Sequence, residues 1–600
     1  MRTIYFNPWK TLYKKPFGAS ICDQVIQFQI RVTEPQVTNV YLVIHKDFGE
    51  TMHLLLTAGQ DSFYSGEYCL NQGKGLYFYH FEIQVKDQAM PLFYGAYQGG
   101  EGRIESNRKN LWEFQITCYQ TQEIAATWYR EAVFYQIFPD RFFNGNPNQI
   151  INQPKANTFL YATPEDQPMY IKNPAGEILR WDFFGGNLKG IQAKIPYLKE
   201  LGITAIYLNP IFEANSNHRY DTSDYFMIDP ILGTLEDFEA LIEALQVNGI
   251  RVMLDGVFSH VGQNSRYFNR DGSYGLGVGA YHNPKSPYFS WFQFIKYPDQ
   301  YQSWWGIEDL PTIDKSNTDF QQMIYGSDHS VIDYWTKRGV DAWRLDVADE
   351  LPDLFIQGIR ERLNQYSEKV LIGEVWEDAS NKISYQQRRQ YLLGEHLQGV
   401  MNYPLRSAIL ALLNQTNTTE QIARMLTTLI ENYPNAVLYN NLNSLGTHDT
   451  ERILTMLDQD LKKLNLAFAI LFYFIGVPCV YYGDEAGLTG HKDPENRQFF
   501  PWKQSNLVTL AISKKWIAVR KENPILIEGT IDLFYTSNLF GILRVKGNDY
   551  EALIVNPTSQ AQSISEALVF MTDPAIVGTH IQEKLQGATI AAFDCLRLVK

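Results

Sequence analysis

Charged side chains interrupt four apolar, strand-like segments of this 600-residue chain, and they are the best candidates for chemistry. In VDAWRLDVA, Arg344 and Asp346 are two residues apart. Because successive strand residues alternate between faces, the two side chains point the same way, and we expect the guanidinium to keep Asp346 ionised. In LIGEVW, Glu374 ends the segment among apolar neighbours. Burial there favours a raised pKa and a protonated carboxyl group.

The other two segments end in a carboxylate and a histidine. Asp255 and His260 lie in LDGVFSH, and His448 and Asp449 lie in SLGTHDTER. Taken singly, these residues have structural interpretations, as a strand ion pair, a helix-capping Glu or satisfied core histidines. If the four segments are neighbouring strands, these side chains would all lie at the same edge of the sheet, and such a convergence favours a catalytic role over a structural one. An ionised carboxyl group opposite a protonated one is the pair that glycoside hydrolysis requires.

The elements that would position these residues alternate between strands and helices. Helical patterns separate eight strand candidates, which predicts an α/β fold, a (β/α)₈ TIM barrel with its active site at the carboxyl ends of the strands. The gap of about 80 residues after the third strand is too long for a simple connection and predicts an inserted subdomain at about 261–317. The strand candidates are 132–139, 203–210, 250–258, 340–348, 370–376, 399–405, 436–446 and 477–483.

Short alternating segments flank this pattern on both sides and predict β-sandwiches. The expected domains are an N-terminal sandwich at 1–125, the catalytic barrel at 126–510 and a C-terminal sandwich at 511–600. One run, Leu466 to Tyr482, carries no charge, but Gly476 and Pro478 interrupt it. We therefore interpret it as a buried helix, a turn and a buried strand rather than a membrane span.

Composition excludes several classes of function. With 52 Lys and Arg against 66 Asp and Glu, the net charge is −14, which argues against a nucleic-acid surface and against a polybasic membrane patch. Five cysteines without a CxxC pair suggest neither a disulfide framework nor a thiolate zinc site. The first residues lack the pattern of a secretory signal, so the expected location is cytoplasmic. Aromatic residues form 14% of the chain, enough for some to face a ligand.

Four segments together resemble a known family. DGVFSH, GVDAWRLDVADE, GEVWEDA and GTHDTER, in this order, are similar to the four signature regions of the α-amylase family of glycoside hydrolases. Further segments resemble the cyclomaltodextrinase, neopullulanase and maltogenic amylase branch, namely REAVFYQIFPDRFFNG, FFGGNLKGI, SNHRYDTSDYF, VMNYPL, YYGDEAGL and DPENRQFFPW. The resemblance spans about 130–505, and the flanking sandwiches fit the branch's starch-binding-like N-terminal domain and its C-terminal domain.

The resemblance implies a retaining mechanism with three catalytic carboxylates. Asp346 would be the nucleophile, and Glu374 the acid that protonates the leaving oxygen and later deprotonates water. Asp449 would grip substrate hydroxyls and favour ring distortion. The implied substrate-binding residues are Tyr220, His260, Arg344, Trp376, His448, Asp493 and Arg497.

Each of these seven residues has an implied place. Arg344, His260 and His448 match positions that hydrogen-bond the sugar in subsite −1, and Tyr220 matches the aromatic ring stacked beneath it. Asp493 and Arg497 match contacts one sugar further out, Trp376 lines the acceptor side, and Asp255 braces Arg344.

The chain departs from the branch at a few positions. Ser259 and Asp349 stand where asparagine is frequent, which puts in doubt the support of His260 and the acceptor-side hydrogen bonds. Several relatives bind calcium through a cluster of Asn and Asp, where this chain has Asn144, Asn146, Asn148 and Asn187. Calcium prefers charged oxygen ligands, so neutral amides weaken the case for it. No cofactor is predicted to be required, and calcium stays as the alternative.

The implied function is hydrolysis of α-1,4-glucosidic bonds in cyclodextrins, maltodextrins and pullulan, with some α-1,6 cleavage and transglycosylation. Two alternatives stay open: an enzyme of the same family in which glucan transfer dominates, and a non-catalytic glycan-binding scaffold. The presence of all three carboxylates argues against the scaffold. The partners implied are α-glucan oligosaccharides and a second copy of the chain in a homodimer, with neither nucleic acid nor membrane.

Overall fold

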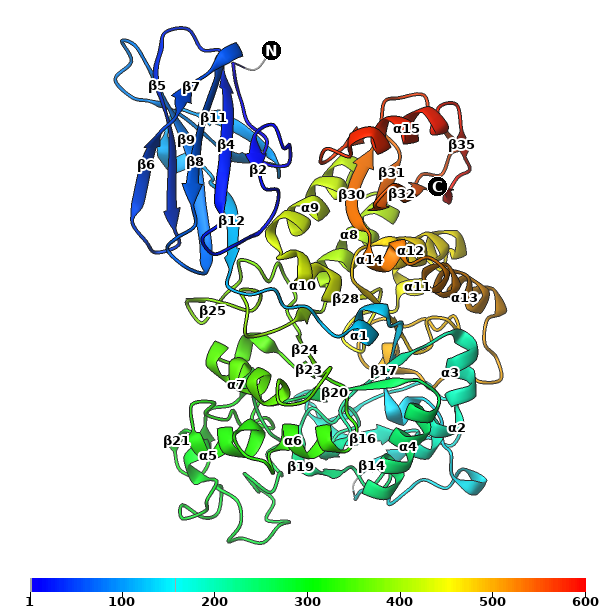
Figure 1. Ribbon diagram of the computed structural model, residues 1–600. Helices are drawn as coiled ribbons and strands as arrows, with labels where there is room; N and C mark the ends of the chain where they lie inside the picture. Colours follow the sequence, from blue (N-terminus) through cyan, green and yellow to red (C-terminus); the bar gives the residue numbers. More distant parts are fainter. Residues whose placement is uncertain (1–2, 157) are drawn as a thin grey trace.

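A closed barrel of eight parallel strands forms the centre of the molecule, which we describe from a computed structural model covering residues 3–156 and 158–600 (Figure 1). Each strand pairs with its neighbours along the chain, and a parallel bridge between Met401 and Leu442 closes the ring. The predicted TIM barrel is therefore confirmed. Its strands are β13 (Phe134–Ile137), β17 (Ala205–Leu208), β20 (Arg251–Gly256), β23 (Ala342–Leu345), β24 (Val370–Gly373), β27 (Gly399–Val400), β28 (Leu442–Ser444) and β29 (Val477–Tyr481).

Helices cover the outside of the barrel, so its strands are buried on both faces. For this reason the strand sequences are continuous apolar runs and do not alternate between apolar and polar residues. Thr234 begins α4 with a capping box, and Thr418 begins α9 in the same way. The main covering helices are α2 (Leu188–Ala193), α3 (Ile195–Leu201), α4 (Leu235–Val247), α6 (Val331–Lys337), α7 (Asp353–Leu363), α8 (Tyr403–Leu413), α9 (Thr419–Asn432), α12 (Leu461–Tyr473) and α13 (Leu507–Glu522).

The uncharged run around residues 466–482 has the predicted structure. It forms the end of α12, a turn at Gly476 with φ of 122°, and the buried strand β29. Among the residues described, no helix combines the length and apolar character needed to cross a membrane.

All eight strand candidates are longer in the sequence prediction than the observed strands, and two of them extend into helices. Residues 435–440 form a short helix, α10 (Asn435–Asn440), which begins after Pro434, and only 442–444 of the seventh candidate are strand. The sixth candidate ends after Val400 because the Asn402 side chain caps α8, and Pro404 stands in its first turn. Proline and a capping side chain favour a helix start over an extended strand.

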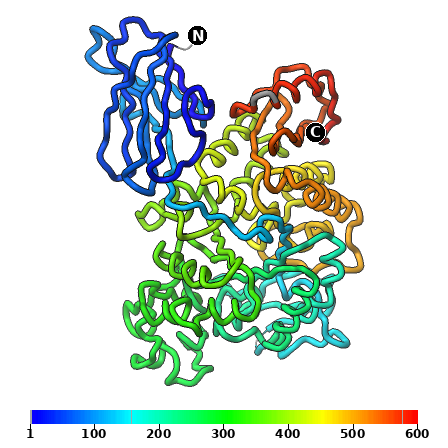
Figure 2. The backbone as a smooth tube through the Cα atoms, in the orientation of Figure 1, coloured from blue at the N-terminus to red at the C-terminus, as the bar shows by residue number. Residues whose placement is uncertain are grey.

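A β-sandwich of two sheets precedes the barrel, as predicted. Its core lies between a five-stranded and a seven-stranded sheet, and α1 (Thr127–Glu131) leads from it into the barrel, a path that the tube in Figure 2 follows. Its long strands are β4 (Val25–Val32), β5 (Val37–Lys46), β8 (Phe63–Cys69), β9 (Gly75–Val85) and β12 (Phe114–Tyr119).

The last part of the chain is built on a five-stranded antiparallel sheet and helix α15 (Ala575–Leu585). The strands of that sheet are β30 (Thr530–Tyr535), β31 (Phe540–Lys546), β32 (Asp549–Asn556), β34 (Val569–Phe570) and β36 (Asp594–Val599). The domain limits at residues 125 and 510 stay a prediction.

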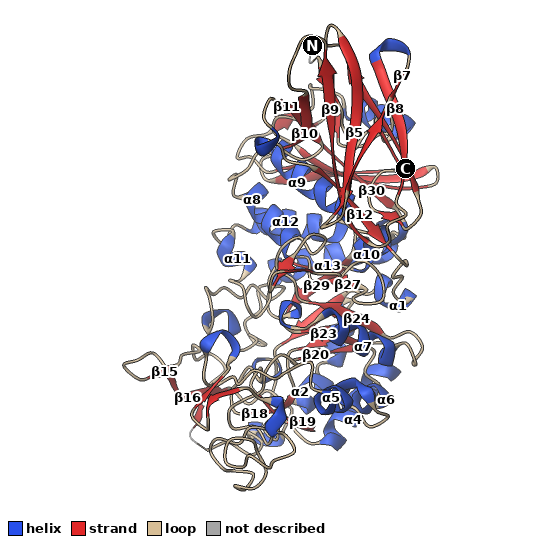
Figure 3. Cartoon of the chain, turned by 90° about the vertical axis from the view of Figure 1, so that its left-hand side faces the viewer, coloured by secondary structure: helices blue, strands red, loops and turns tan. Residues whose placement is uncertain are grey.

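Three excursions from the barrel surround its carboxyl-terminal rim. The predicted insertion at 261–317 contains β21 (Phe294–Lys296) and β22 (Gln300–Tyr301). A second, unpredicted excursion follows β13 and contains β14 (Thr158–Leu160), β15 (Ile171–Lys172) and β16 (Ile178–Phe183), with β15 and β16 projecting from the body in Figure 3. A small hairpin of β25 (Ile383–Ser384) and β26 (Gln387–Arg388) follows β24.

Candidate active site

One buried guanidinium holds three carboxylates together at the rim of the barrel. Nη1 of Arg344 lies 2.6 Å from Oδ1 of Asp255 and 2.8 Å from Oδ1 of Asp346, and Nη2 lies 2.8 Å from Oε2 of Glu374. Strand register explains the cluster, since Asp255 on β20 stands opposite Arg344 on β23. The expected shared face of Arg344 and Asp346 is present. Asp346 and Glu374 are thus close enough for one side chain to contact both.

Burial changes the pKa of Asp346 more than the sequence suggested. Loss of solvent raises the pKa of Asp346 well above its ordinary range, while Arg344 opposes the shift and the carboxylates of Glu374 and Asp255 add to it. Arg344 lowers the pKa of Asp346, as expected, but one guanidinium faces several carboxylates, and the ionisation of Asp346 stays a prediction. Burial also raises the pKa of Asp255, which accepts hydrogen bonds from the hydroxyls of Tyr207 and Tyr220.

Glu374 lies among hydrogen-bond donors, and not among apolar groups as expected. Besides the ion pair with Arg344, the backbone N–H of Val347 donates to its Oε2 at 2.8 Å, and the indole N–H of Trp376 donates to its Oε1 at 3.0 Å. Val347 has φ of 40°, a backbone conformation that β-branched residues rarely adopt. The residue after Asp346 is thus held in a strained conformation whose N–H faces Glu374.

Asp449, the third of the predicted catalytic carboxylates, lies beside a neutral histidine. Its Oδ2 lies 3.2 Å from Nε2 of His448, and its Oδ1 lies 3.8 Å from Nη2 of Arg497. Asp449 itself is partly exposed to the cleft, and desolvation by the surrounding protein first, and the Glu374 carboxylate second, raise its pKa to about 7. Burial lowers the pKa of His448 well below its ordinary value, and its Nδ1 faces the amide of Gln136 at 3.1 Å.

Tyr220 and His260 form the wall next to Asp346. The ring of Tyr220 stacks on that of His448, with centroids 5.1 Å apart and an interplanar angle of 5°. Nε2 of His260 lies 3.1 Å from the carbonyl oxygen of Tyr220, and the Ser259 hydroxyl lies 2.8 Å from its Nδ1. Both ring nitrogens of His260 thus have partners within the protein, and burial lowers its pKa to about 4.

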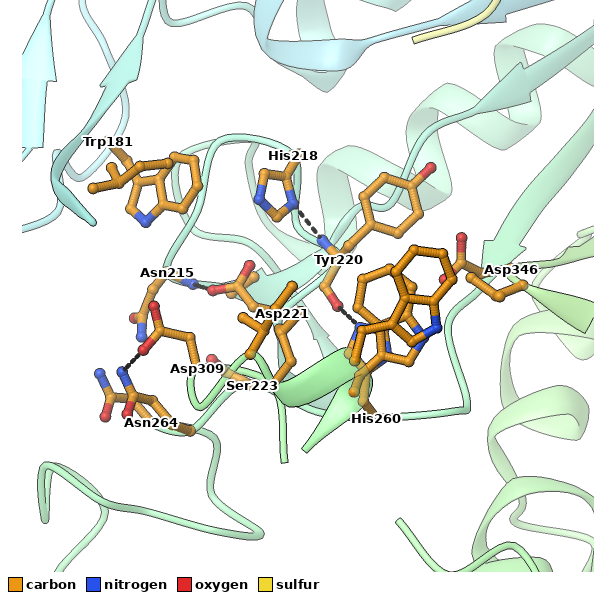
Figure 4. A pocket seen from close by; sticks show the side chains of 18 of the residues that line it. Trp181, Asn215, His218, Tyr220, Asp221, Ser223, His260, Asn264, Asp309 and Asp346 are labelled. Atoms are coloured by element: carbon orange, nitrogen blue, oxygen red, sulfur yellow. Dashed lines mark hydrogen bonds between the residues drawn. The ribbon is translucent and has the colours of Figure 1, made fainter. Parts of the chain in front are cut away.

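Arg497 and Asp493 lie further along the same wall. Nη1 of Arg497 is 2.9 Å from Oδ1 of Asp493, which also accepts a hydrogen bond from the Tyr170 hydroxyl. Trp181 packs edge-on against the ring of His218, and Figure 4 shows Trp181 on the far side of Tyr220 from Asp346. Tyr170, Trp181 and His218 were not predicted from the sequence as site residues. His218 lies in SNHRYDTSDYF, one of the segments that carry the family resemblance. For Tyr170 and Trp181 the only signal was the high fraction of aromatic residues.

A cleft of about 1840 Å³ connects these walls. Of the predicted catalytic and substrate-binding residues, all except Arg344 line it, and Arg344 lies fully buried beneath. Small-molecule sites usually measure about 300–1,000 Å³, so the cleft has room for several sugar rings. Its outer parts are lined by the excursion that carries Trp181, by Trp304 and Trp305 of the 261–317 insertion, and by the hairpin around Tyr385.

The asparagine cluster does not fit a calcium ion. Oδ1 of Asn187 accepts hydrogen bonds from the backbone N–H groups of Gly145 and Gly190, and Oδ1 of Asn144 accepts from the amide of Asn187 and the backbone of Asn146. The oxygens that a hard cation would need are already used. In the described part of the chain, no group of three His, Cys, Asp or Glu side chains is arranged to hold a metal ion.

Comparison with known proteins assigns this architecture to a class. The family model of the alpha amylase catalytic domain matches residues 136–528, and the chain therefore belongs to the α-amylase family of glycoside hydrolases. The chain is 34% identical to the cyclomaltodextrinase of Geobacillus thermopakistaniensis, over 73% of this chain and 71% of that protein.

Two further similarities involve α-glucan enzymes. The chain is 33% identical to the amylopullulanase of Thermoanaerobacter thermohydrosulfuricus over 97% of its own length and 44% of the relative's. This chain spans between about a third and a half of the length of the amylopullulanases that it matches. The cyclic α-maltosyl-(1→6)-maltose hydrolase of Arthrobacter globiformis, solved in complex with that sugar, superposes with a TM-score of 0.69 at 30% identity, covering 80% of this chain and all of the other.

Proposed function

We propose that this chain is a retaining hydrolase of α-1,4-glucosidic bonds in cyclodextrins and maltodextrins that also acts on pullulan, cleaves some α-1,6 bonds and transfers some glycosyl groups. The observation that carries the proposal is the contact of Asp346 and Glu374 with one guanidinium at the bottom of a long cleft. Retaining enzymes need a nucleophile and an acid on either side of a single glycosidic bond. Similarity to a cyclomaltodextrinase and an amylopullulanase supports the substrate class.

The reaction proceeds in two displacements. An oxygen of Asp346 attacks the anomeric carbon while Glu374 donates a proton to the glycosidic oxygen, so the bond to the leaving sugar breaks and a glycosyl ester forms. Glu374, now ionised, takes a proton from water. The water oxygen attacks the same carbon, Asp346 leaves as a carboxylate, and the product keeps its configuration.

Neighbouring groups supply charge and orientation for these steps. Arg344 stabilises the carboxylate that Asp346 must present, and it opposes the effect of burial on that group. Asp449 and Arg497 bind hydroxyls of the sugar that is attacked and of the next one. The flat face of Tyr220, stacked on His448, supports the ring from below. His260 positions Tyr220 through its carbonyl contact and completes this wall.

A comparison of three substrates tests the proposal. Incubation with γ-cyclodextrin, pullulan and starch should give shorter linear sugars and a steady rise in reducing ends. Products longer than the substrate, with few new reducing ends, would favour the transfer-dominated alternative. Unchanged substrates would favour the scaffold. Asp346→Asn is the matched control, and its kcat should fall at least about 10³-fold because the nucleophile is lost.

Assembly and location are also part of the proposal. We infer a homodimer in which the N-terminal sandwich of each copy helps to shape the other's cleft, as the family resemblance implies. A mass of one chain by light scattering at working concentration would contradict it. All five cysteines are free, and thiols persist in a reducing compartment, which supports a cytoplasmic location.

A further inference from the structure

Two aromatic side chains at the mouth of the cleft are exposed far more than folding requires. Trp305, in the 261–317 insertion, is 77% exposed, and Tyr385, in the β25–β26 hairpin, is 71% exposed. Both line the same cleft as Asp346 and Glu374. Both also have left-handed backbones, with φ of 52° and 50°. Such conformations cost free energy in residues other than glycine, and neither ring recovers it by burial.

One carboxylate holds the two side chains together. The indole N–H of Trp305 donates to Oε1 of Glu350 at 3.3 Å, and the hydroxyl of Tyr385 donates to Oε2 of the same group at 2.6 Å. Glu350 lies in the 3-10 turn Ala348–Glu350, which begins two residues after Asp346. The rings come from separate excursions of the chain, yet their common partner is four residues from the proposed nucleophile.

Further contacts fix both excursions. Trp305 stacks on Trp304 with centroids 5.0 Å apart, and Trp304 stacks on His260 at 5.2 Å, so a row of rings leads outward from the wall beside Asp346. The hairpin of Tyr385 is anchored where Lys382 pairs with Asp349 at 3.0 Å.

The base of the hairpin is tied down as well. Ser384 donates to the carbonyl of Asp349, and Arg388 pairs with Asp47 of the N-terminal sandwich at 2.7 Å. In Figure 1 the hairpin lies at the foot of that sandwich. These contacts anchor the hairpin at both ends, and the row of stacked rings anchors Trp305, which preorganises the two exposed side chains.

The polar atoms of the two rings are used by Glu350. One face of Trp305 packs on Trp304, and its other face and the exposed ring of Tyr385 are left for a ligand. Flat aromatic faces pack against the C–H surfaces of sugar rings, and exposed apolar surface beside a substrate cleft marks a binding site. The hairpin follows Glu374 and Trp376 along the chain and lines the cleft with them. We therefore assign it to the side of the leaving sugar, where the family resemblance puts Trp376.

We propose that Trp305 and Tyr385, braced by Glu350, form an outer acceptor-side site that binds a glucose ring of the substrate chain beyond Trp376. This inference rests on the proposed function, because it assumes that the cleft binds an α-glucan. The site favours long or cyclic substrates over short ones, since only a chain that extends past Trp376 reaches both rings. Glu350 acts as a positioning residue and does not touch the reacting atoms.

Calorimetric titration with maltoheptaose tests the site directly. In an Asp346→Asn background, which prevents turnover, Trp305→Ala and Tyr385→Ala should each weaken the Kd by about three- to tenfold, the loss expected for one stacked ring. Leu507→Ala is the matched control, because Leu507 is 75% exposed at the start of α13 and does not line the cleft. It should leave the Kd unchanged.

The outcomes separate the two proposals. Unchanged affinity in both ring variants, with melting temperatures equal to that of the parent, would overturn the outer site and leave the hydrolase intact. If the Asp346→Asn parent itself fails to bind maltoheptaose, both proposals fall.

Kinetics in the active enzyme give a second readout. Trp305→Ala should raise KM for γ-cyclodextrin by a larger factor than KM for p-nitrophenyl α-maltoside, whose leaving group is too short to reach the ring. An equal rise for both substrates would contradict the outer position. Glu350→Ala should reproduce part of the effect, and Glu350→Gln, which keeps one acceptor oxygen, should restore some of the loss.

Discussion

Four acidic residues and few cations meet at the bottom of the cleft, and this imbalance sets the proton distribution. Arg344 contacts Asp255, Asp346 and Glu374, while Arg497 faces Asp449 at 3.8 Å. Desolvation raises the pKa of Asp346 and Asp449, and the neighbouring carboxylates raise it further because ionising several like charges together costs free energy. The cluster can therefore hold a proton near neutral pH, as acid catalysis requires.

The raised pKa of Asp449 predicts a pH-dependent stability. The folded protein binds this proton up to about pH 7, whereas the unfolded chain releases it near pH 3.8. Protonation thus stabilises the fold fully below the unfolded value, and that stabilisation is lost as pH rises through about 7. Asp449→Asn removes the cost of ionisation, so its melting temperature should exceed that of the parent by about 2 °C at pH 8.

The comparison with pH 5 decides whether ionisation is the cause. There the parent carries the proton, and the difference in melting temperature between Asp449→Asn and the parent should become small. An equal difference at both pH values, measured by differential scanning calorimetry, would show that the substitution acts through packing and not through charge.

Strand alternation was enough to predict that Arg344 and Asp346 meet, and they form an ion pair at 2.8 Å. The other site residues were expected from the family resemblance. The protonation states of these carboxyl groups could not be predicted in the same way. They depend on how many carboxylates share one guanidinium, and Asp255 is 89 positions away from Arg344 along the chain. The two hydrogen bonds donated to Glu374, by the backbone N–H of Val347 and the indole N–H of Trp376, were not predicted either.

At the scale of elements, the asparagine cluster ties the loop after β13 to the start of α2. Asn187 is the N-cap of α2, and its side chain accepts from the backbone of Gly190 at 2.8 Å. The same oxygen accepts from Gly145, and its amide donates to Asn144 at 2.9 Å. Hydrogen bonds between neutral amides thus make the connection that an ion would make between carboxylates.

This network predicts stability that does not depend on calcium. The melting temperature in EDTA should equal that in calcium chloride, since no ligand binds only the folded state. Asn187→Asp removes the donor to Asn144 and should destabilise the fold by about 1–3 kcal/mol by urea denaturation. A melting temperature that falls in EDTA and recovers with calcium would contradict the amide network.

The strands of the barrel were predictable because they are short apolar runs between helical patterns, and the excursions were less so. The insertion at 261–317 was detected from the length of the gap, but the excursion that carries Trp181 was not. Its strands have only two to six residues, and they pair with each other across irregular loops. Short strands of this kind lack the periodicity that identifies an element. Residues 436–441 were misassigned because Pro434 begins a helix there.

At the scale of the whole molecule, the N-terminal sandwich reaches the rim of the barrel in the same chain. Arg388 pairs with Asp47, and Gln115 of the sandwich donates to the hydroxyl of Ser380 at 3.1 Å. These contacts hold the loop between Trp376 and the hairpin of Tyr385. The sandwich therefore supports the acceptor side of the cleft, a role that composition and strand patterns could not indicate because it depends on contacts more than 250 residues apart.

The central claim is that Asp346 forms a covalent bond to the sugar while Glu374 acts as acid and base. Glu374→Gln mixed with α-maltosyl fluoride tests it most directly. Fluoride leaves without a proton, so the first step proceeds, and the missing base slows the second. We predict that mass spectrometry of the digested protein finds one maltosyl group on the peptide that contains Asp346, and none in the double variant Asp346→Asn/Glu374→Gln. A maltosyl group on another residue, or none while β-configured maltose accumulates, would contradict the account.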